Sequence, residues 1–191
     1  IMEPEMALSQ MQYFRRNPST VAVATNVSLN DEAGSVLQAK LYRLEEDRVF
    51  FKNEYLRAYL SEKIWLPTPT IMFHRATLLS TFSQWITLSE RETQYRPSLD
   101  IFLIVVMNTA GPVALLKQPL LRYRQHGSQE SRNVDQTFPM LDLLRLIIKD
   151  GDLLFFHHGL RKNLLGLYLK YCAQHILLNC QAEDKIPSRL K

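Results

Sequence analysis

Apolar and polar positions along the first 135 residues follow helical and strand-like spacings in turn. Ala7, Met11 and Phe14 recur with the spacing of one helix face, and the Asn17-Pro18 pair ends that pattern. The run Val21–Ala24 predicts a short buried strand, and Asn30–Gly34 is rich in turn formers. The start of the chain therefore predicts a helix, a strand and a turn.

The middle of the chain continues this alternation. Residues 45–63 are charged and aromatic, and their second part has a helical pattern. The proline-rich stretch Leu66–Thr70 breaks it, and Ile71–Arg75 predicts another strand. Ala76–Ile86 predicts a helix, and the polar stretch Ser89–Arg96 predicts a loop.

A further helix is predicted after Ser98, which is a suitable N-cap. Its expected core face repeats at positions i, i+3, i+4 and i+7, and consists of Leu99, Phe102, Leu103 and Val106. Gly111 ends this helix.

The run Val113–Tyr123 predicts two short strands broken by Lys117-Gln118-Pro119. Alternating helices and strands favour an α/β fold with a partly parallel sheet. After Pro139 only helical patterns remain. We therefore expect an α/β domain over residues 1–135 and a helical C-terminal extension over residues 136–191.

Composition narrows the class of protein. The 191 residues are 46% hydrophobic and 22% charged, as in a globular protein. The net charge of +4 suits an anionic partner such as a nucleotide diphosphate or a membrane surface. Lys and Arg form no long basic run, so we expect no nucleic-acid binding. No apolar run reaches the length of about 20 residues that a bilayer span requires.

The two cysteines favour a reducing compartment. Cys172 and Cys180 lie eight positions apart in a helical pattern, a rise of about 12 Å. This separation is too large for a disulfide within one helix. We expect both thiols to be reduced and the protein to be cytoplasmic.

The residues that could take part in chemistry lie in four segments. In chain order these are Ile1-Met2-Glu3-Pro4, Pro69–Arg75, the helix start around Asp100, and Tyr123-Arg124-Gln125-His126-Gly127. This order resembles the second, acceptor-side half of the catalytic domain of inverting family 2 glycosyltransferases, over about residues 1 to 132. The resemblance implies a GT-A-like mixed sheet whose N-terminal, nucleotide-binding half is absent from this chain. That half would end in an Asp-x-Asp-like motif immediately before Ile1.

The resemblance also implies an activity and its partners. A sugar would pass with inversion from a nucleotide-diphosphate donor to a glycan or lipid-linked acceptor. The implied cofactor is a divalent cation, Mn or Mg, with no tightly bound organic cofactor. Such an enzyme is expected in the cytoplasm, at the inner face of the membrane, and this fragment alone is expected to be inactive.

By this resemblance, Asp100 is the catalytic base. Inverting transfer needs a base that removes the proton of the acceptor hydroxyl as it attacks the anomeric carbon. The family often places Glu or Asp before this residue, whereas Leu99 stands here. The alternative is that Asp100 only stabilises the helix N-terminus through the helix dipole, a contribution of up to about 1 kcal/mol.

Arg124 and His126 are the implied ligands of the donor diphosphate, with His126 also a metal ligand. The alternatives are an ion pair for Arg124 and a hydrogen bond to a loop carbonyl for His126. Thr70, His74 and Arg75 are implied on the acceptor side. For these three the alternative is a capped strand end with a solvated Arg.

The helical extension has open interpretations. Its apolar faces would pack on the α/β part, on another subunit of a homo-oligomer, or on a membrane surface as a peripheral anchor. The rival to the enzyme hypothesis as a whole is a non-catalytic α/β-plus-helix module that binds partners.

Overall fold

The computed structural model describes residues 1–62, 64–91 and 99–126, together with residues 144, 145, 166, 168, 169, 172 and 173. The chain divides into two compact units, one of Ile1–Arg91 with Leu99–Val134 and one of Glu92–Ser98 with Asp135–Lys191. The predictions for Ser98, for residues 92–96 and for nearly all of the helical extension lie outside the described residues. In the second unit Leu144 is buried and Cys172 forms no disulfide.

The first unit is built on a mixed five-stranded sheet, so the α/β class is confirmed. The long strands β1 (Ala22–Asn30) and β5 (Val113–Arg124) pair in parallel over their whole length. The short strands β2 (Val36–Gln38) and β4 (Met72–Phe73) pair antiparallel with β1, and β3 (Arg48–Phe50) pairs antiparallel with β5. The sheet order is β2-β1-β5-β3, with β4 beside β1.

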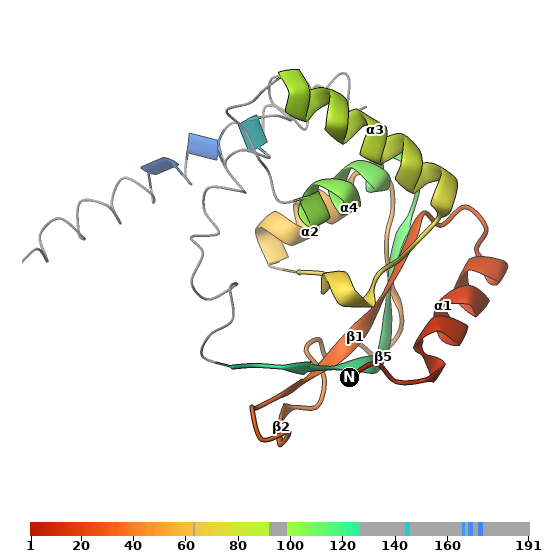
Figure 1. Cartoon of the computed structure of the whole chain (residues 1–191), viewed down its shortest axis with the longest axis vertical. Helices are drawn as coiled ribbons and strands as arrows, with labels where there is room; N and C mark the ends of the chain where they lie inside the picture. Colours follow the sequence, from red (N-terminus) through yellow and green to blue (C-terminus); the bar gives the residue numbers. More distant parts are fainter. Residues whose placement is uncertain are drawn as a thin grey trace, which may run out of the picture. The chain divides into compact units, whose positions relative to one another are not determined.

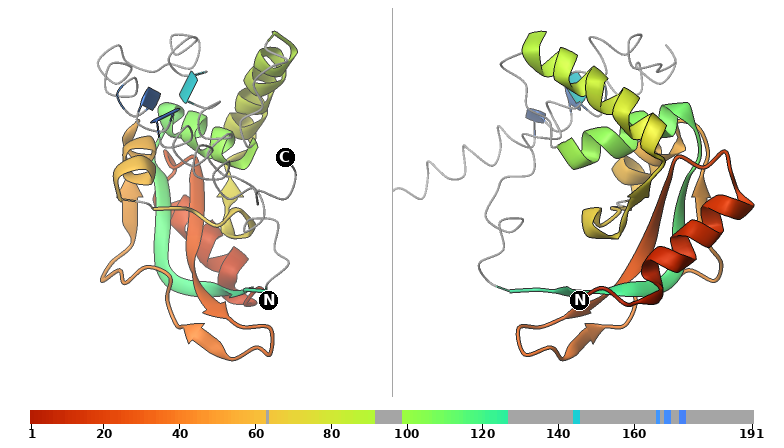
Figure 2. Two further views of the ribbon diagram at one scale, coloured as in Figure 1. Left: turned by 90° about the vertical axis from the view of Figure 1, so that its left-hand side faces the viewer. Right: turned by 45° about the vertical axis from the view of Figure 1, so that its right-hand side comes forward.

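Helices cover both faces of this sheet (Figures 1 and 2). Helix α1 (Glu5–Arg16) lies on one face, and α2 (Glu54–Glu62) and α4 (Leu99–Ala110) lie on the other, with α3 (Arg75–Arg91) against α4. Both faces of β1 are therefore covered, and its first six residues are buried. No helix among the described residues is long and apolar enough to cross a lipid bilayer.

The buried face of α1 differs from the predicted one. Ala7 and Met11 are exposed, whereas Met6 and Gln10 are buried. The Gln10 amide nitrogen donates to the carbonyl of Val23 at 2.9 Å and to that of Thr70 at 2.6 Å. A buried glutamine is tolerated because both carbonyls accept from it, and α1 is rotated accordingly.

Two strands extend further than predicted because polar residues are satisfied inside the sheet. The predicted strand 21–24 continues to Asn30, through the buried Asn26. The two strands predicted over 113–123 are one strand, β5, with register shifts opposite Asn26. The Asn26 amide donates to Tyr42 O at 2.6 Å and to Lys117 O at 3.3 Å, which stabilises the irregular pairing.

The structure also differs from the predictions at β4, α3 and α4. Of the predicted strand 71–75 only Met72–Phe73 forms the strand β4, and Arg75 begins α3, which continues to Arg91. In α4, Phe102 and Val106 are buried as predicted, but Leu99 is exposed and Leu103 only half-buried. The predicted turn at 30–34 is confirmed, with Gly34 at a φ of +92°.

Replacing Gly111 with alanine is expected to destabilise the fold by about 1–3 kcal/mol because it overpacks a filled site. A Cβ at Gly111 would lie 2.7 Å from Val21 Cγ1 and 2.8 Å from the Ser19 carbonyl oxygen. Urea unfolding followed by circular dichroism measures the effect. Ala110→Ser, at the neighbouring exposed position, is the control and should change the free energy of unfolding by less than about 0.5 kcal/mol. Equal stabilities of the two variants would contradict the packing argument.

Candidate functional site

Asp100 lies in the first turn of α4 and contacts a turn that is distant in sequence. This turn is the 3-10 helix η1 (Thr68–Thr70), in the proline-rich segment before β4. The Thr68 hydroxyl donates to Asp100 Oδ2 at 2.7 Å, and the Ile101 backbone nitrogen donates to Asp100 Oδ1 at 2.8 Å. The half-buried carboxylate is thus held in one orientation by these two hydrogen bonds.

Two tyrosine hydroxyls hold the backbone that leads into η1. The Tyr42 hydroxyl donates to Trp65 O at 2.7 Å and accepts from Trp65 N at 2.8 Å. The Tyr55 hydroxyl accepts from Leu66 N at 3.3 Å. Burial is the main cause that raises the pKa of Tyr55 far above its ordinary value, and the Asp100 carboxylate is among the smaller causes. Tyr55 therefore stays protonated near Asp100.

The predicted acceptor-side residues lie close in sequence to Thr68, which binds Asp100, but they differ in exposure. Thr70 is fully buried, and its hydroxyl donates to Pro67 O at 2.7 Å. His74 is exposed and precedes α3, with Nδ1 3.1 Å from the Thr77 hydroxyl. Arg75 is exposed at the first position of α3. His74 therefore lies between the end of β4 and the start of α3, Arg75 is the first residue of α3, and Thr70 supports the turn from inside.

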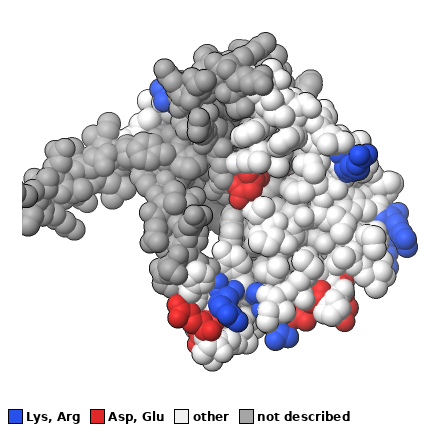
Figure 3. All heavy atoms as spheres, viewed as in Figure 1, with Lys and Arg blue, Asp and Glu red and all other residues white. Residues whose placement is uncertain are grey.

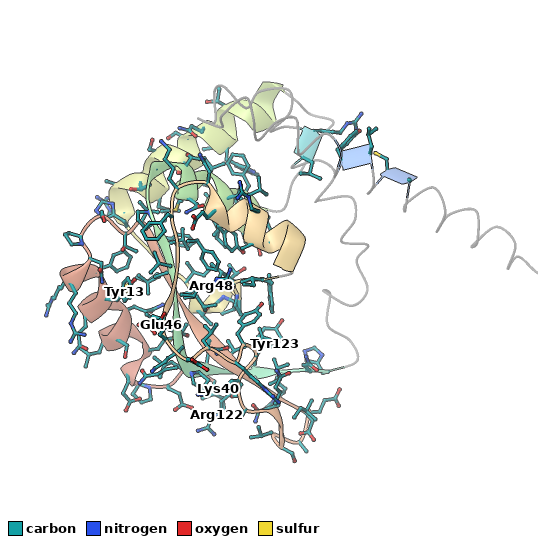
Figure 4. All side chains as sticks on the ribbon, turned by 180° about the vertical axis from the view of Figure 1, so that it is seen from behind. Tyr13, Lys40, Glu46, Arg48, Arg122 and Tyr123 are labelled. Atoms are coloured by element: carbon teal, nitrogen blue, oxygen red, sulfur yellow. The ribbon has the colours of Figure 1, made fainter. Side chains whose placement is uncertain are left out.

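Arg124 and His126 lie at the carboxyl end of β5. Arg124 pairs with Asn30 at the end of the parallel ladder and is exposed, and His126 is half-buried just beyond it. The two neighbouring residues Arg122 and Tyr123 are labelled in Figure 4, near the end of this strand. Gly127, the last residue of the motif, lies outside the described residues.

An aromatic contact connects the two parts of the candidate site. The rings of Trp65 and Tyr123 meet edge to face, with centroids 5.9 Å apart and planes at 87°. Trp65 lies three residues before Thr68, which binds Asp100, and Tyr123 directly precedes Arg124. The segment from Trp65 to Thr68 thus reaches from the end of β5 to Asp100.

The first residues of the chain pair with the same end of β5. The Ile1 nitrogen donates to Arg122 O at 2.9 Å, and the Arg122 nitrogen donates to Ile1 O at 2.8 Å. Glu3 N donates to Leu120 O, and the Glu3 carboxylate forms an ion pair with Arg122 at 2.7 Å. This antiparallel register points any residue directly before Ile1 toward Tyr123 and beyond.

The described residues do not by themselves make up a metal site. His126 offers one imidazole, but no group of three or more His, Cys, Asp or Glu side chains within the described part of the chain is placed to hold a metal ion. Two carboxylates of this region, on Glu3 and Asp100, are engaged with Arg122 and Thr68.

No protein-family model matches this sequence, and a search of curated proteins finds no significant match.

Sequence reasoning missed Thr68, Tyr42 and Tyr55 as parts of this site. Their roles depend on partners 32, 23 and 11 residues away, and a hydroxyl's distant partner leaves no local pattern. The sequence shows the repeat Pro67-Thr68-Pro69-Thr70, which does not distinguish the threonine that binds Asp100. In the structure Thr68 is exposed and Thr70 is buried.

On the face shown in Figure 3, acidic and basic side chains lie mixed along the lower rim. Above this rim, most of the surface that the described residues form is uncharged and drawn in white. Electrostatic recognition on this face therefore depends on individual side chains rather than on one basic patch.

Proposed function

We propose that this chain is the acceptor-side part of an inverting, nucleotide-sugar-dependent glycosyltransferase with a GT-A-type fold. The hydrogen bond between Thr68 and Asp100 carries the proposal. It joins the helix start and the proline-rich segment, which are separate in sequence and which the resemblance to family 2 enzymes assigns to one acceptor cleft. The mixed sheet with parallel β1 and β5 supports the fold assignment.

The chemistry is a single in-line displacement. The acceptor hydroxyl oxygen forms a bond to the anomeric carbon as the bond from that carbon to the diphosphate oxygen breaks. Asp100 takes the proton of the attacking hydroxyl, and the nucleoside diphosphate leaves with the bonding electron pair. Thr68 and the Ile101 amide orient the carboxylate that receives this proton.

Arg124 and His126 are proposed to bind the donor diphosphate. Guanidinium geometry matches phosphate oxygens, and a protonated imidazole adds a further donor. The N-terminal register supports this role because residues preceding Ile1 would run beside Tyr123 to His126, where an acidic motif would meet the same diphosphate. In that case His126 would contribute one nitrogen to a divalent cation, which would neutralise charge on the leaving diphosphate.

The remaining partners follow from the same proposal. The acceptor is a glycan or a lipid-linked glycan, and His74 and Arg75 are proposed to contact it. The helical extension is proposed to bind a second subunit or a membrane surface at the cytoplasmic side. In this proposal residues 1–135 form the acceptor-side domain. Residues 136–191 form a separate domain, which binds the second subunit or the membrane.

The proposal is tested by donor turnover in the protein that includes the residues preceding Ile1. Uridine, guanosine and thymidine diphosphate sugars are incubated with Mn or Mg, and release of the nucleoside diphosphate is followed with and without cell-envelope glycan extract. We expect release from one donor class, stimulated by the extract. No release from any donor, together with no thermal shift on adding the free nucleoside diphosphates, would contradict the enzyme assignment.

Replacing Thr68 with valine is expected to lower kcat about tenfold, the loss of roughly one charge-assisted hydrogen bond, with donor KM unchanged. Because the Thr68 hydroxyl stabilises the charged carboxylate, its removal should also move the acidic limb of the pH–rate profile to higher pH. Thr87→Val is the matched control, since the Thr87 hydroxyl is exposed on α3 and bonds only a backbone carbonyl. An unchanged pH profile in Thr68→Val would argue against the positioning role.

A further inference from the structure

A small hollow lies on the α1 face of the sheet, which is opposite to the face that carries α4 and Asp100. Its volume is about 190 Å³. One wall is α1, through Ser9, Gln12, Tyr13 and Arg16, and the other is formed by Asp47 and the Leu116–Gln118 stretch of β5. We call this the α1 hollow. Figure 4 shows Tyr13 on α1 beside the segment that carries Glu46 and leads to Arg48, the first residue of β3.

The helical wall of the α1 hollow is a regular polar stripe. Its four residues are spaced i, i+3, i+4 and i+7, so one helix face presents all of them to the hollow. Gln12 and Arg16 are exposed, and Ser9 and Tyr13 are half-buried. The core-facing residues Met6 and Gln10 lie on a different face of α1. Within the stripe, Tyr13 also packs against the core cluster of Val23, Ala114 and Leu116, whereas Gln12 and Arg16 stay exposed.

The opposite wall is an irregularity of β5 that is held in place. The register with β1 passes from Leu116 opposite Thr25 to Pro119 opposite Asn26, so Lys117 and Gln118 have no partner residue on β1 and are exposed. Asp47 Oδ1 accepts from Lys117 N at 2.9 Å, and Lys117 Nζ donates to Glu45 O at 3.0 Å. Bulges fixed in this way re-aim side chains and are frequent beside binding sites.

The groups around the α1 hollow suit a ligand that both donates and accepts hydrogen bonds. Gln12 and Gln118 offer amides, Ser9 and Tyr13 offer hydroxyls, and Leu116 is the only aliphatic wall. The negative charge of Asp47 reaches the Tyr13 hydroxyl, because burial and then Asp47 raise the pKa of Tyr13. Arg16 and Lys117 add positive charges to the lining and Asp47 adds a negative one, so the charges are mixed and suit a neutral ligand with many hydroxyls. A purely apolar ligand would leave the amides without partners.

We propose that the α1 hollow binds one monosaccharide ring, either a free sugar or the end of a glycan chain, at a site separate from Asp100. Pockets for drug-sized ligands have volumes of roughly 300–1,000 Å³, so this smaller hollow takes a single ring. The Tyr13 ring can pack against the apolar face of a sugar, while the amides and Asp47 bind its hydroxyls. The inference does not depend on the proposed function, because no residue of the α1 hollow belongs to the Asp100 site.

The test is a titration of the whole 191-residue chain, labelled with ¹⁵N, with methyl glycosides of glucose, galactose, mannose and N-acetylglucosamine, with lactose and maltose, and with sodium phosphate. We expect one sugar to shift the amide signals of Gln12, Tyr13 and Gln118 with a dissociation constant on the order of 1 mM, as a few hydrogen bonds provide. A disaccharide that binds more tightly than its methyl glycoside would assign the hollow to a glycan end.

Substitutions at two exposed residues, compared with a matched control, locate the binding site. Gln12→Ala combined with Gln118→Ala should weaken sugar binding about tenfold, through the loss of two hydrogen-bonding side chains. Arg15→Ala, on the adjacent exposed position of α1 and outside the hollow, should bind like the unchanged protein. The proposal is overturned if no sugar shifts these signals up to about 50 mM, if phosphate alone shifts them, or if the double variant binds sugar as well as the control does.

Discussion

Replacing Asp100 with asparagine is expected to lower kcat for sugar transfer by about 10³-fold, within the range that a positioned general base contributes. The amide has the shape of the carboxylate: its oxygen can accept from the Ile101 nitrogen while its NH2 group donates to the Thr68 hydroxyl oxygen, so the turn and α4 should keep their arrangement. What it cannot do is take the acceptor proton. The measurement is initial transfer rate, with donor KM determined in parallel, on the protein that includes the residues preceding Ile1.

The control for this experiment is Asp31→Asn. Asp31 also accepts from a backbone nitrogen, that of Ser35 at 2.7 Å, but it lies in the exposed turn between β1 and β2. Its variant should transfer sugar at the normal rate. Asp100→Asn with more than about a tenth of normal kcat would remove Asp100 as the base, because a general base contributes at least about 10²-fold. In that case a contribution to the helix dipole would be its remaining role.

Replacing Asn108 with leucine is expected to destabilise the first unit by at least about 3 kcal/mol, because several buried polar groups would lose their partner. The fully buried Asn108 amide donates to the carbonyls of Phe50, Phe51 and Gly111 at 3.0, 3.0 and 3.2 Å. Its oxygen accepts from Tyr55 N, at the start of α2, at 2.9 Å. One side chain thus joins α4, β3 and α2, and leucine fills the space without any of these bonds.

Urea unfolding measures this loss, and two further variants define its cause. Asn17→Ala removes a single exposed hydrogen bond to Tyr13 O and should cost less than about 1 kcal/mol. Asn108→Asp keeps the acceptor for Tyr55 but places a carboxylate against three carbonyls. Since burial disfavours the charged form, its destabilisation should be large at neutral pH and should shrink as pH falls and the carboxyl protonates. The amide network would contribute little if the destabilisation of Asn108→Asp did not depend on pH, or if Asn108→Leu lowered the free energy of unfolding only slightly.

The class of fold could be predicted from the sequence because it depends on local periodicity. The helix over 99–110 and the long run over 113–124 carry strong apolar patterns, and their order already favours a partly parallel sheet. Strands β2 and β3 have three residues each, too few for a period-two pattern to emerge. They form only because β1 and β5 offer edges with which to pair.

The errors share one physical cause, which is polar side chains satisfied by distant backbone. Gln10 lies on the buried face of α1 because its amide meets carbonyls 13 and 60 residues away. Asn26 continues a strand that turn propensity alone would have ended, because its amide binds Tyr42 O and Lys117 O. Local propensity assigns such residues to surfaces and turns, and tertiary hydrogen bonds reverse that assignment.

The candidate site was predicted in part. Asp100 was named because an acid at the head of an apolar helix fits the order of segments in family 2 enzymes, and its catalytic role stays a prediction. Its partner Thr68 was not named. Thr70 was expected beside the acceptor, yet its hydroxyl is buried on Pro67 O. Thr68 and Thr70 each follow a proline in the same turn, so their sequence contexts are similar. Only the three-dimensional turn distinguishes Thr68, which binds Asp100.

The most direct test of the glycosyltransferase account is the sequence that the native gene product carries before Ile1, read by intact mass and N-terminal sequencing. The account predicts a nucleotide-binding βαβ half on the order of 100 residues, ending in an Asp-x-Asp-like motif next to Ile1. The pairing of Ile1 with Arg122 would then place those acids along the strand that ends at His126. A native product without such a segment and motif would contradict the account and favour a non-catalytic binding module.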